Sequence, residues 1–403
     1  MKKNEMPVFG NLQGIKVLSA SSAIAGPFSA GMFSEQGADV IQIESVKSPD
    51  MLRNFGDTWS DFHKNQRGIT LDVPNIESRP ILEKLIKWAD ILIESSKGGT
   101  WKKWGLSDEV LWEMNPKLVI THISGFGQTG DPEYIPRASF DVVGQAFSGY
   151  MSINGEPDPA PPYAPKPFLC DYTTALFAAF GTLAAYYRAK ETGKGESLDV
   201  AQFETLVRMQ GNYLMDSLNK GTEFQRMGNK DIIGATDGTE KCKDGRWYYI
   251  AVGGAGPLKK LEKLLGLEGD PDFIEPHSII ARSFPERAAK FNKAIKAFCL
   301  EHTPEELDEI FSKLQIPSSP IMTYKMMMEN PHYQAREVFI EWEDPSTNKQ
   351  IKGPAPVPKF KNNPSRVFRG GPTYGQDNED VFAELGFNEG DIQEFYNKGL
   401  IKK

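Results

Sequence analysis

The chain has 403 residues, a formal net charge of −8 and a sequence pI near 5.4. Its length predicts two or three domains, with enough residues for a full hydrophobic core. The net charge is mildly acidic, and the sequence contains no stripe of basic residues. This argues against nucleic acid as a partner. The N-terminal residues contain no apolar segment of a signal peptide, and the longest nearly apolar run, 176–187, is too short to cross a bilayer. We therefore expect a cytoplasmic protein that does not enter a membrane.

Cysteine and histidine are sparse in this sequence. The three cysteines, Cys170, Cys242 and Cys299, form no CxxC pair and no disulfide framework. We therefore expect reduced thiols, as in most cytoplasmic proteins. None of the five histidines is paired at the spacing of metal ligands, which predicts that the chain has no metal site.

The first half of the chain alternates apolar strands with amphipathic helices. Strands are expected at residues 15–20, 39–44, 69–73, 90–94 and 118–123, and helices at residues 27–36 and 77–88. A repeating strand–helix–strand order is typical of a parallel α/β sheet. We assign residues 1–227 to one large α/β domain.

The pattern changes after residue 227. The next expected elements are a strand at 247–252 and helices at 258–265, 284–302 and 304–314. They predict a smaller α/β domain over residues 228–325, in which the glycines of 253–256 turn the strand into a helix. Residues 326–403 are predicted to be a linker and a C-terminal segment that returns to the large domain. Its proline- and glycine-rich part, 354–374, is predicted to lie across another surface rather than to fold alone.

Asp171 stands at the start of a long helix that is rich in small residues and ends near Gly193. One interpretation makes Asp171 the N-cap, because aspartate accepts hydrogen bonds from the free amides of a first helical turn. The other makes it a nucleophile that the helix dipole keeps ionised. Cys170 is a competing nucleophile, but no adjacent histidine lowers its pKa. The expected role of Cys170 is a small buried apolar side chain.

The segment SGFGQTG contains the GxGxxG pattern after a predicted strand, with Gly125 and Gly127 as its first two glycines. A dinucleotide site also needs a helix that begins at the third glycine and holds the pyrophosphate. The prolines that follow favour a turn, which argues against a nicotinamide-dependent oxidoreductase. We expect a glycine-rich loop beside a site, where the backbone can approach a ligand closely.

Lys97 follows the strand at 90–94, and ligands of open α/β sheets bind at the carboxyl ends of strands. Lys102, Lys103 and Arg67 are further candidates for contacts to a phosphate-bearing ligand. The alternative for each lysine is a solvated position on the surface.

These pieces occur together in one family. The chain resembles the class III CoA-transferases, the formyl-CoA and L-carnitine type, over nearly its whole length. The resemblance lies in residues 14–44, 89–98, 115–130, 145–157, 170–200 and 353–365. Within the family the L-carnitine branch is the most similar, in the segments QAFSGY and PKFKNNP.

The resemblance implies roles for individual residues. The family's catalytic aspartate falls on Asp171 and its CoA-contacting lysine on Lys97. A CoA-contacting arginine of the family falls on Trp104, and Lys102 or Lys103 would supply that charge instead. The resemblance also implies a Rossmann-like large domain built from both chain ends and an interlocked homodimer. It implies no permanently bound cofactor, since coenzyme A enters as the substrate thioester.

In the chemistry implied by this resemblance, Asp171 attacks an acyl-CoA thioester and becomes an aspartyl-CoA thioester. Amides near Gly125 and Gly127 are the candidate donors to the oxyanions. The expected acids are L-carnitine, γ-butyrobetaine and crotonobetaine. Phe147 and Tyr150 are the candidate aromatic faces for their quaternary ammonium group.

Two alternatives keep the fold and change the reaction. One is a 2-hydroxyacyl-CoA transferase of amino-acid fermentation. The other is an acyl-CoA racemase, which in this superfamily uses a histidine beside a loop aspartate as its second base. The corresponding loop, 137–141, contains no histidine, which argues against a racemase.

Overall fold

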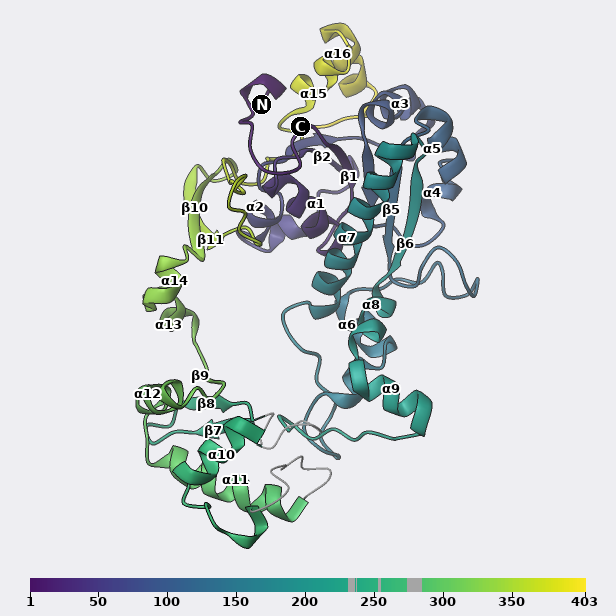
Figure 1. Ribbon diagram of the computed structural model, residues 1–403. Helices are drawn as coiled ribbons and strands as arrows, with labels where there is room; N and C mark the ends of the chain where they lie inside the picture. The colour runs from purple at the N-terminus through teal and green to yellow at the C-terminus, as the bar shows by residue number, and fades with distance from the viewer. Residues whose placement is uncertain (231–235, 237, 253–254, 274–284) are drawn as a thin grey trace. The chain divides into compact units, whose positions relative to one another are not determined.

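A computed structural model describes residues 1–230, 236, 238–252, 255–273 and 285–403. The chain divides into two compact units, which are coloured by residue number in Figure 1. The first unit comprises Met1–Tyr150, Ala164–Thr222 and Arg336–Lys403, and the second comprises Met151–Tyr163 and Glu223–Ala335. This division differs from the predicted one mainly at residues 151–163, which group with the second unit.

The first unit is built on a six-stranded sheet. Its strands are β1 (Lys16–Ala20), β2 (Asp39–Glu44), β3 (Arg67–Thr70), β4 (Ile91–Glu94), β5 (Val119–Ser124) and β6 (Glu196–Ala201). They lie in the order β3-β2-β1-β4-β5-β6, and every neighbouring pair is parallel. This confirms the predicted parallel α/β sheet. The strand order reverses between β1 and β4, and such a reversal opens a crevice at the carboxyl ends of the strands.

Helices cover both faces of this sheet. The helices of the first unit are α1 (Ala25–Glu35), α2 (Thr58–Phe62), α3 (Arg79–Trp88), α4 (Thr100–Lys103), α5 (Asp108–Met114), α6 (Asp141–Phe147), α7 (Leu169–Thr192), α8 (Gln202–Met209), α9 (Gly211–Lys220), α15 (Asn378–Glu384) and α16 (Glu389–Asn397). Among the described helices, none combines the length and the apolar character that crossing a membrane requires.

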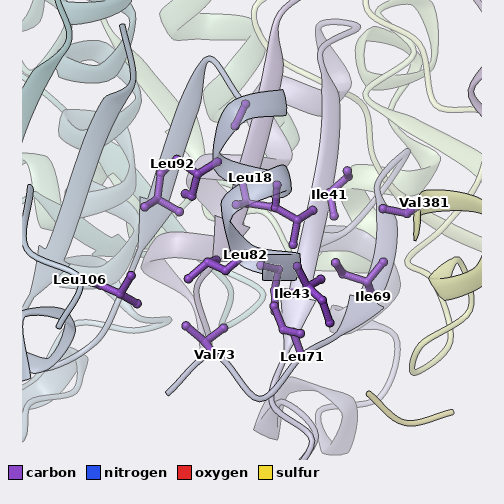
Figure 2. Close-up of a cluster of buried hydrophobic side chains, with 14 of the residues drawn as sticks. Leu18, Ile41, Ile43, Ile69, Leu71, Val73, Leu82, Leu92, Leu106 and Val381 are labelled. Atoms are coloured by element: carbon purple, nitrogen blue, oxygen red, sulfur yellow. The ribbon is translucent and has the colours of Figure 1, made fainter. Parts of the chain in front are cut away.

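The sheet has a buried apolar cluster on each of its two faces. Adjacent residues of one strand belong to different clusters, because side chains alternate across a strand. Leu18 and Ile41 belong to a buried cluster that includes residues of α3 and α15, and Figure 2 shows part of it. Val17 and Val40 belong to a second cluster with residues of α1 and α7. Burial on both faces explains the nearly continuous apolar strands that the sequence contains.

The C-terminal segment belongs to the core of the first unit. It begins with an antiparallel hairpin of β10 (Phe339–Asp344) and β11 (Lys349–Pro354). Val381 and Phe382 of α15 are buried in the cluster of Figure 2, and Asn378 Oδ1 accepts a 3.0 Å hydrogen bond from the amide of Thr70. The segment thus packs against the sheet of the first unit, in agreement with the prediction that it returns to the large domain rather than folding alone, and it also contributes core residues of its own.

The second unit has a small antiparallel sheet with the order β7-β8-β9. Its elements are β7 (Thr239–Lys241), β8 (Trp247–Ile250), β9 (Ser318–Pro320), α10 (Ala255–Leu264), α11 (Pro285–Leu300), α12 (Pro304–Leu314), α13 (Tyr324–Glu329) and α14 (Pro331–Ala335). The expected strand and three helices of this region are present. The helix at 304–314 has the predicted ends, and the other elements have shifted ends. The predicted glycine turn includes residues 253 and 254, which lie outside the described residues.

Candidate active site

Asp171 is the third residue of α7 and is only 6% exposed. The helix follows Phe168, whose φ is 46°, and the side chain of Phe168 makes no cap hydrogen bond. Instead Asp141 Oδ1, from α6, accepts hydrogen bonds from the amides of Cys170 and Asp171 at 2.7 and 3.1 Å. The interpretation of Asp171 as the N-cap is therefore wrong, because the carboxylate of Asp141 satisfies these amides and leaves that of Asp171 free for another role.

The surroundings of the Asp171 carboxylate are unfavourable for its charge. Its one hydrogen bond from a side chain comes from the Nε2 of Gln202, which begins α8, and the described part of the chain gives it no salt bridge. Burial and the charge of Asp141 raise the pKa of Asp171 to about 7, while the hydrogen bond from Gln202 lowers it. Burial and Asp141 thus act against the ionised form, which is opposite to the effect expected from the helix dipole.

Asp171 lines a cavity of about 160 Å³ at the carboxyl ends of β1, β4 and β5. Lys97 and Gly125 line the same cavity, so the structure brings three of the predicted site residues together. Gly127 does not line it, and its amide donates to Ser124 Oγ at 2.9 Å. The structure therefore does not bring Gly127 to the cavity of Asp171, and its role as an oxyanion donor stays a prediction.

A larger cavity of about 670 Å³ adjoins this one and shares Ser22 and Ser96 with it. It lies over the carboxyl ends of β1 to β4, where open α/β sheets bind ligands. Trp104 lines the larger cavity, whereas Lys103 is exposed and lines neither. The family's arginine position thus faces the cavity, but the neighbouring lysine does not replace it there.

A third cavity, of about 180 Å³, has an almost wholly apolar wall and shares Asp171 with the first. Its lining residues are Ala23, Ile24, Met51, Leu52, Phe55, Phe140, Asp141, Val142, Phe168 and Asp171. The three cavities therefore adjoin one another, and Asp171 lines both the first cavity and this apolar one.

Three predicted ligand contacts lie elsewhere. Arg67 is fully buried, and its guanidinium pairs with Asp39 at 2.9 Å and with Glu384 at 2.5 Å. Its prediction as a CoA contact is wrong, because it holds β2, β3 and α15 together. Phe147 packs in an aromatic cluster, 5.0 Å from the ring of Phe126 and 5.1 Å from that of Phe203. Neither Phe147 nor Tyr150 lines any of the three cavities.

Cys170 is excluded as the nucleophile by its surroundings. It is fully buried, and its thiol donates to the carbonyl of Gln202 at 3.3 Å. Burial and the nearby carboxylates raise the pKa of Cys170 to about 12, so the reactive thiolate is scarce at neutral pH. The expected role as a small buried side chain is confirmed.

A buried ion cluster supports the loop that carries Lys97. Glu94, at the end of β4, accepts from the amide of Ser96 at 2.7 Å and contacts His122 Nδ1 at 2.6 Å. His122 Nε2 lies 2.9 Å from Asp108. Burial alone would lower the pKa of His122, but its two carboxylate partners raise it to about 9. His122 is therefore a structural cation rather than a catalytic base, and it lines none of the cavities.

The sequence analysis missed Gln202 and the capping role of Asp141. Gln202 directly follows β6, so its position at the carboxyl end of a parallel strand was an available signal. Residues 131–140 form turns and no helix after the GxGxxG segment, which removes the helix terminus that a dinucleotide needs. Over the described ranges, no group of three histidine, cysteine or acidic residues is placed to hold a metal ion.

A family model described as CoA-transferase family III matches residues 12–378. The chain belongs to CoA-transferase family III. This family III chain is 45% identical over 402 residues to the bile acid CoA-transferase BaiK of Clostridium scindens, a match that covers 98% of this chain and 91% of that protein. The predicted family is thus confirmed.

Solved structures show the same fold. A CAIB/BAIF family protein from Brucella suis is 27% identical, with a TM-score of 0.78 over 94% of this chain and all of that chain. The protein Rv3272 from Mycobacterium tuberculosis is 21% identical, also with a TM-score of 0.78, over 92% of this chain and 99% of that one. The second likeness concerns the fold alone.

Proposed function

We propose that this family III transferase moves CoA from a donor acyl-CoA to a carboxylic acid through a thioester on Asp171. The observation that supports this is the position of Asp171, a buried carboxylate with no salt bridge among the described residues, in the wall of two adjoining cavities, one of them apolar. Perturbed carboxylates of this kind concentrate at catalytic sites.

The reaction follows from a carboxylate nucleophile. The Asp171 carboxylate attacks the donor thioester carbonyl, which gives a mixed anhydride and CoA thiolate. The thiolate attacks the aspartyl carbonyl, which gives the aspartyl-CoA thioester and releases the donor acid as a carboxylate. The acceptor carboxylate then attacks this thioester, and the same steps in reverse return Asp171 to its free form.

The neighbouring residues have separate tasks. Gln202 Nε2 already donates to Asp171 and is the candidate donor to the oxyanion that forms on the aspartyl carbonyl. Lys97 and Arg137 line the cavity of Asp171 and supply positive charge for the CoA phosphates. The nucleotide end would occupy the larger cavity, where Trp104 offers an aromatic face to the base.

The acid we propose has an apolar skeleton next to its carboxyl group. The apolar cavity beside Asp171 excludes polar groups that find no hydrogen bond there, and the relative BaiK is named for bile acids. A cavity of about 180 Å³ holds the aliphatic chain that carries the carboxyl group of a bile acid, with the rings beyond it. The expected carnitine-type acids followed from the likeness of QAFSGY and PKFKNNP to the L-carnitine branch, with Phe147 and Tyr150 as the aromatic faces. We do not retain these acids, because both residues lie outside the cavities.

A branched 2-hydroxy acid is the second candidate, because the whole of its side chain fits a cavity of this size. A racemase is not retained. The cavity that contains Asp171 is lined by no histidine, so a second base of that type is missing from the described residues there.

The functional unit that we propose is a homodimer. Its support is a row of exposed apolar side chains along α7, at Leu176, Phe180, Leu183 and Tyr187, a spacing that places them on one face of the helix. Phe180 and Tyr187 are 76% and 71% exposed, and an apolar surface of this extent usually marks an interface.

The cytoplasmic location of the protein stays a prediction.

The test of the reaction uses Asp171→Ala, with Cys170→Ala as the matched control. We expect Asp171→Ala to lose transfer and Cys170→Ala to keep it. Incubation with acyl-CoA followed by hydroxylamine should modify Asp171, and peptide mass spectrometry locates the modification. Transfer that persists in Asp171→Ala, or a modification on Cys170, would contradict the proposal.

The test of the acid compares kcat/KM for cholate, 2-hydroxyisocaproate and L-carnitine as acceptors. We expect cholate to be the best of the three. Val142→Trp, which fills the apolar cavity, should reduce the preference for cholate. A higher kcat/KM for 2-hydroxyisocaproate than for cholate would select the second candidate. A higher kcat/KM for carnitine would overturn the proposal that the acid has an apolar skeleton.

A further inference from the structure

Asp141 is a second buried carboxylate beside Asp171, and the reaction above does not use it. It is the first residue of α6, and both of its oxygens are occupied. Oδ1 accepts from the amides of Cys170 and Asp171, and Oδ2 accepts from Gln145 Nε2 at 2.5 Å. Its carboxylate therefore joins the start of α6 to the first turn of the helix that carries the nucleophile.

The charge of Asp141 is not neutralised by a cation. Among the residues that the structure describes, neither Asp141 nor Asp171 forms a salt bridge, although Lys97 and Arg137 line the cavity of Asp171. The other polar neighbours of Asp171 are the thiol of Cys170, within the same turn, and the amide of Gln202. After burial, the charge of Asp141 is the next largest cause of the raised pKa of Asp171.

We propose that Asp141 is a positioning residue with two effects: it fixes the backbone of the nucleophile, and its charge favours the covalent form of Asp171 over the free carboxylate. The inference rests on the proposed function.

The second effect follows from the charges of the reaction. When the donor thioester and the Asp171 carboxylate become aspartyl-CoA and a free acid, Asp171 loses its negative charge and the released acid gains it. The repulsion between Asp141 and Asp171 is relieved in this step, because like charges in a buried site destabilise one another. The same repulsion makes the Asp171 carboxylate a poorer leaving group in the mixed anhydride. This protects the acylated enzyme from loss of its acyl group during its lifetime.

Two substitutions separate geometry from charge. Asp141→Asn keeps an oxygen that accepts from the two amides but removes the charge. Its new amide group can donate to Gln145 Oε1, which has no hydrogen-bond partner among the described residues, after a half-turn of the Gln145 side chain. Asp141→Glu keeps the charge but moves the carboxylate by one methylene, so the amides of Cys170 and Asp171 lose their acceptor.

The readouts are the pH dependence of single-turnover acylation and the equilibrium amount of aspartyl-CoA that hydroxylamine traps. For Asp141→Asn we expect the midpoint of the pH dependence to fall by about one pH unit and the trapped thioester to decrease several-fold. For Asp141→Glu we expect a midpoint close to that of the wild type and a lower acylation rate. Gln145→Ala is the matched control, because it removes a partner of Asp141 without changing the charge, and its midpoint should not move.

An unchanged midpoint and an unchanged thioester level in Asp141→Asn would overturn the inference. Thermal unfolding of each variant shows whether it is folded. If Asp141→Asn is poorly folded, the midpoint of the pH dependence in Asp141→Glu becomes the deciding measurement. A fall of one pH unit in that variant would contradict the role of charge. Failure of the proposed function is distinguishable, since it would appear as transfer in Asp171→Ala whatever the Asp141 variants do.

Discussion

Two buried carboxylates of the first unit have opposite surroundings. Asp377 is fully buried and lies 2.8 Å from Arg369 Nη2, and it accepts from the amide of Gly68 at 2.7 Å. Burial alone would raise the pKa of Asp377, but Arg369 and the hydrogen bonds lower it below its ordinary value. Asp171 is buried to a similar degree, has Asp141 as its charged neighbour, and has a pKa of about 7.

The difference shows that burial by itself does not decide what a carboxylate does. With a cation and amides around it, the charge of Asp377 is compensated, and it fixes the C-terminal segment against β3. With another carboxylate beside it, Asp171 stays reactive at a cost in stability. The predictions below test this contrast, from the largest expected effect to the smallest.

Asp377→Asn should have the largest effect on stability. It leaves the guanidinium of Arg369 buried without its carboxylate, which we expect to lower the free energy of unfolding at pH 7 by roughly 3–5 kcal/mol. Because the folded-state pKa of Asp377 is lowered, its contribution is present above about pH 4 and is lost as the pH falls through the folded-state pKa. Urea unfolding at pH 7 measures the effect, and wild-type stability in this variant would refute the assigned role.

Asp171→Asn, the same substitution at the other carboxylate, should stabilise the protein. The folded-state pKa of about 7 exceeds the ordinary value of 3.8, so the cost of the charge grows as the pH rises from about 4 and is complete above about 7. We expect the variant to gain roughly 2–4 kcal/mol at pH 8 and nothing at pH 4. Urea unfolding at both pH values provides the test. A gain that does not depend on pH would mean that charge is not its cause.

Gln202→Leu should change the titration of Asp171 rather than the fold. The hydrogen bond from Gln202 Nε2 favours the ionised carboxylate, so its loss should raise the midpoint of the pH dependence of kcat/KM by about one unit above 7. The rate at pH 7 falls because less of the nucleophile is ionised and because the candidate oxyanion donor is lost. Initial rates between pH 5.5 and 9 measure the midpoint, and a midpoint that moves down would contradict this role for Gln202.

Lys97→Ala should have the smallest effect of the four. The side chain is exposed, and an exposed ion pair contributes about 1 kcal/mol or less, so we expect KM for acyl-CoA to rise up to about fivefold. KM for the free acid should not change. Lys103→Ala is the matched control, since Lys103 lines none of the three cavities. Equal effects of the two variants would assign Lys97 to the solvated surface.

The sequence by itself determined most strands of the parallel sheet and the candidate nucleophile. The strands at β1, β2, β4 and β5 were predicted within one residue or so, because buried parallel strands leave short apolar runs bounded by polar or turn residues. Asp171 and Lys97 were found from their places at a helix start and after a strand. These are local features, and local features are what a sequence displays directly.

Only the tertiary structure decided which charges are compensated. Arg67 meets Glu384 across 317 positions of the chain, and Asp141 meets the amide of Asp171 across 30. No periodicity records such pairs, so Arg67 was mistaken for a ligand contact, and the capping role of Asp141 was missed while the cap interpretation of Asp171 stayed open. The state of a buried group depends on neighbours that folding brings from distant segments, because the Coulomb energy and the cost of desolvation are set by distance in space and not along the chain.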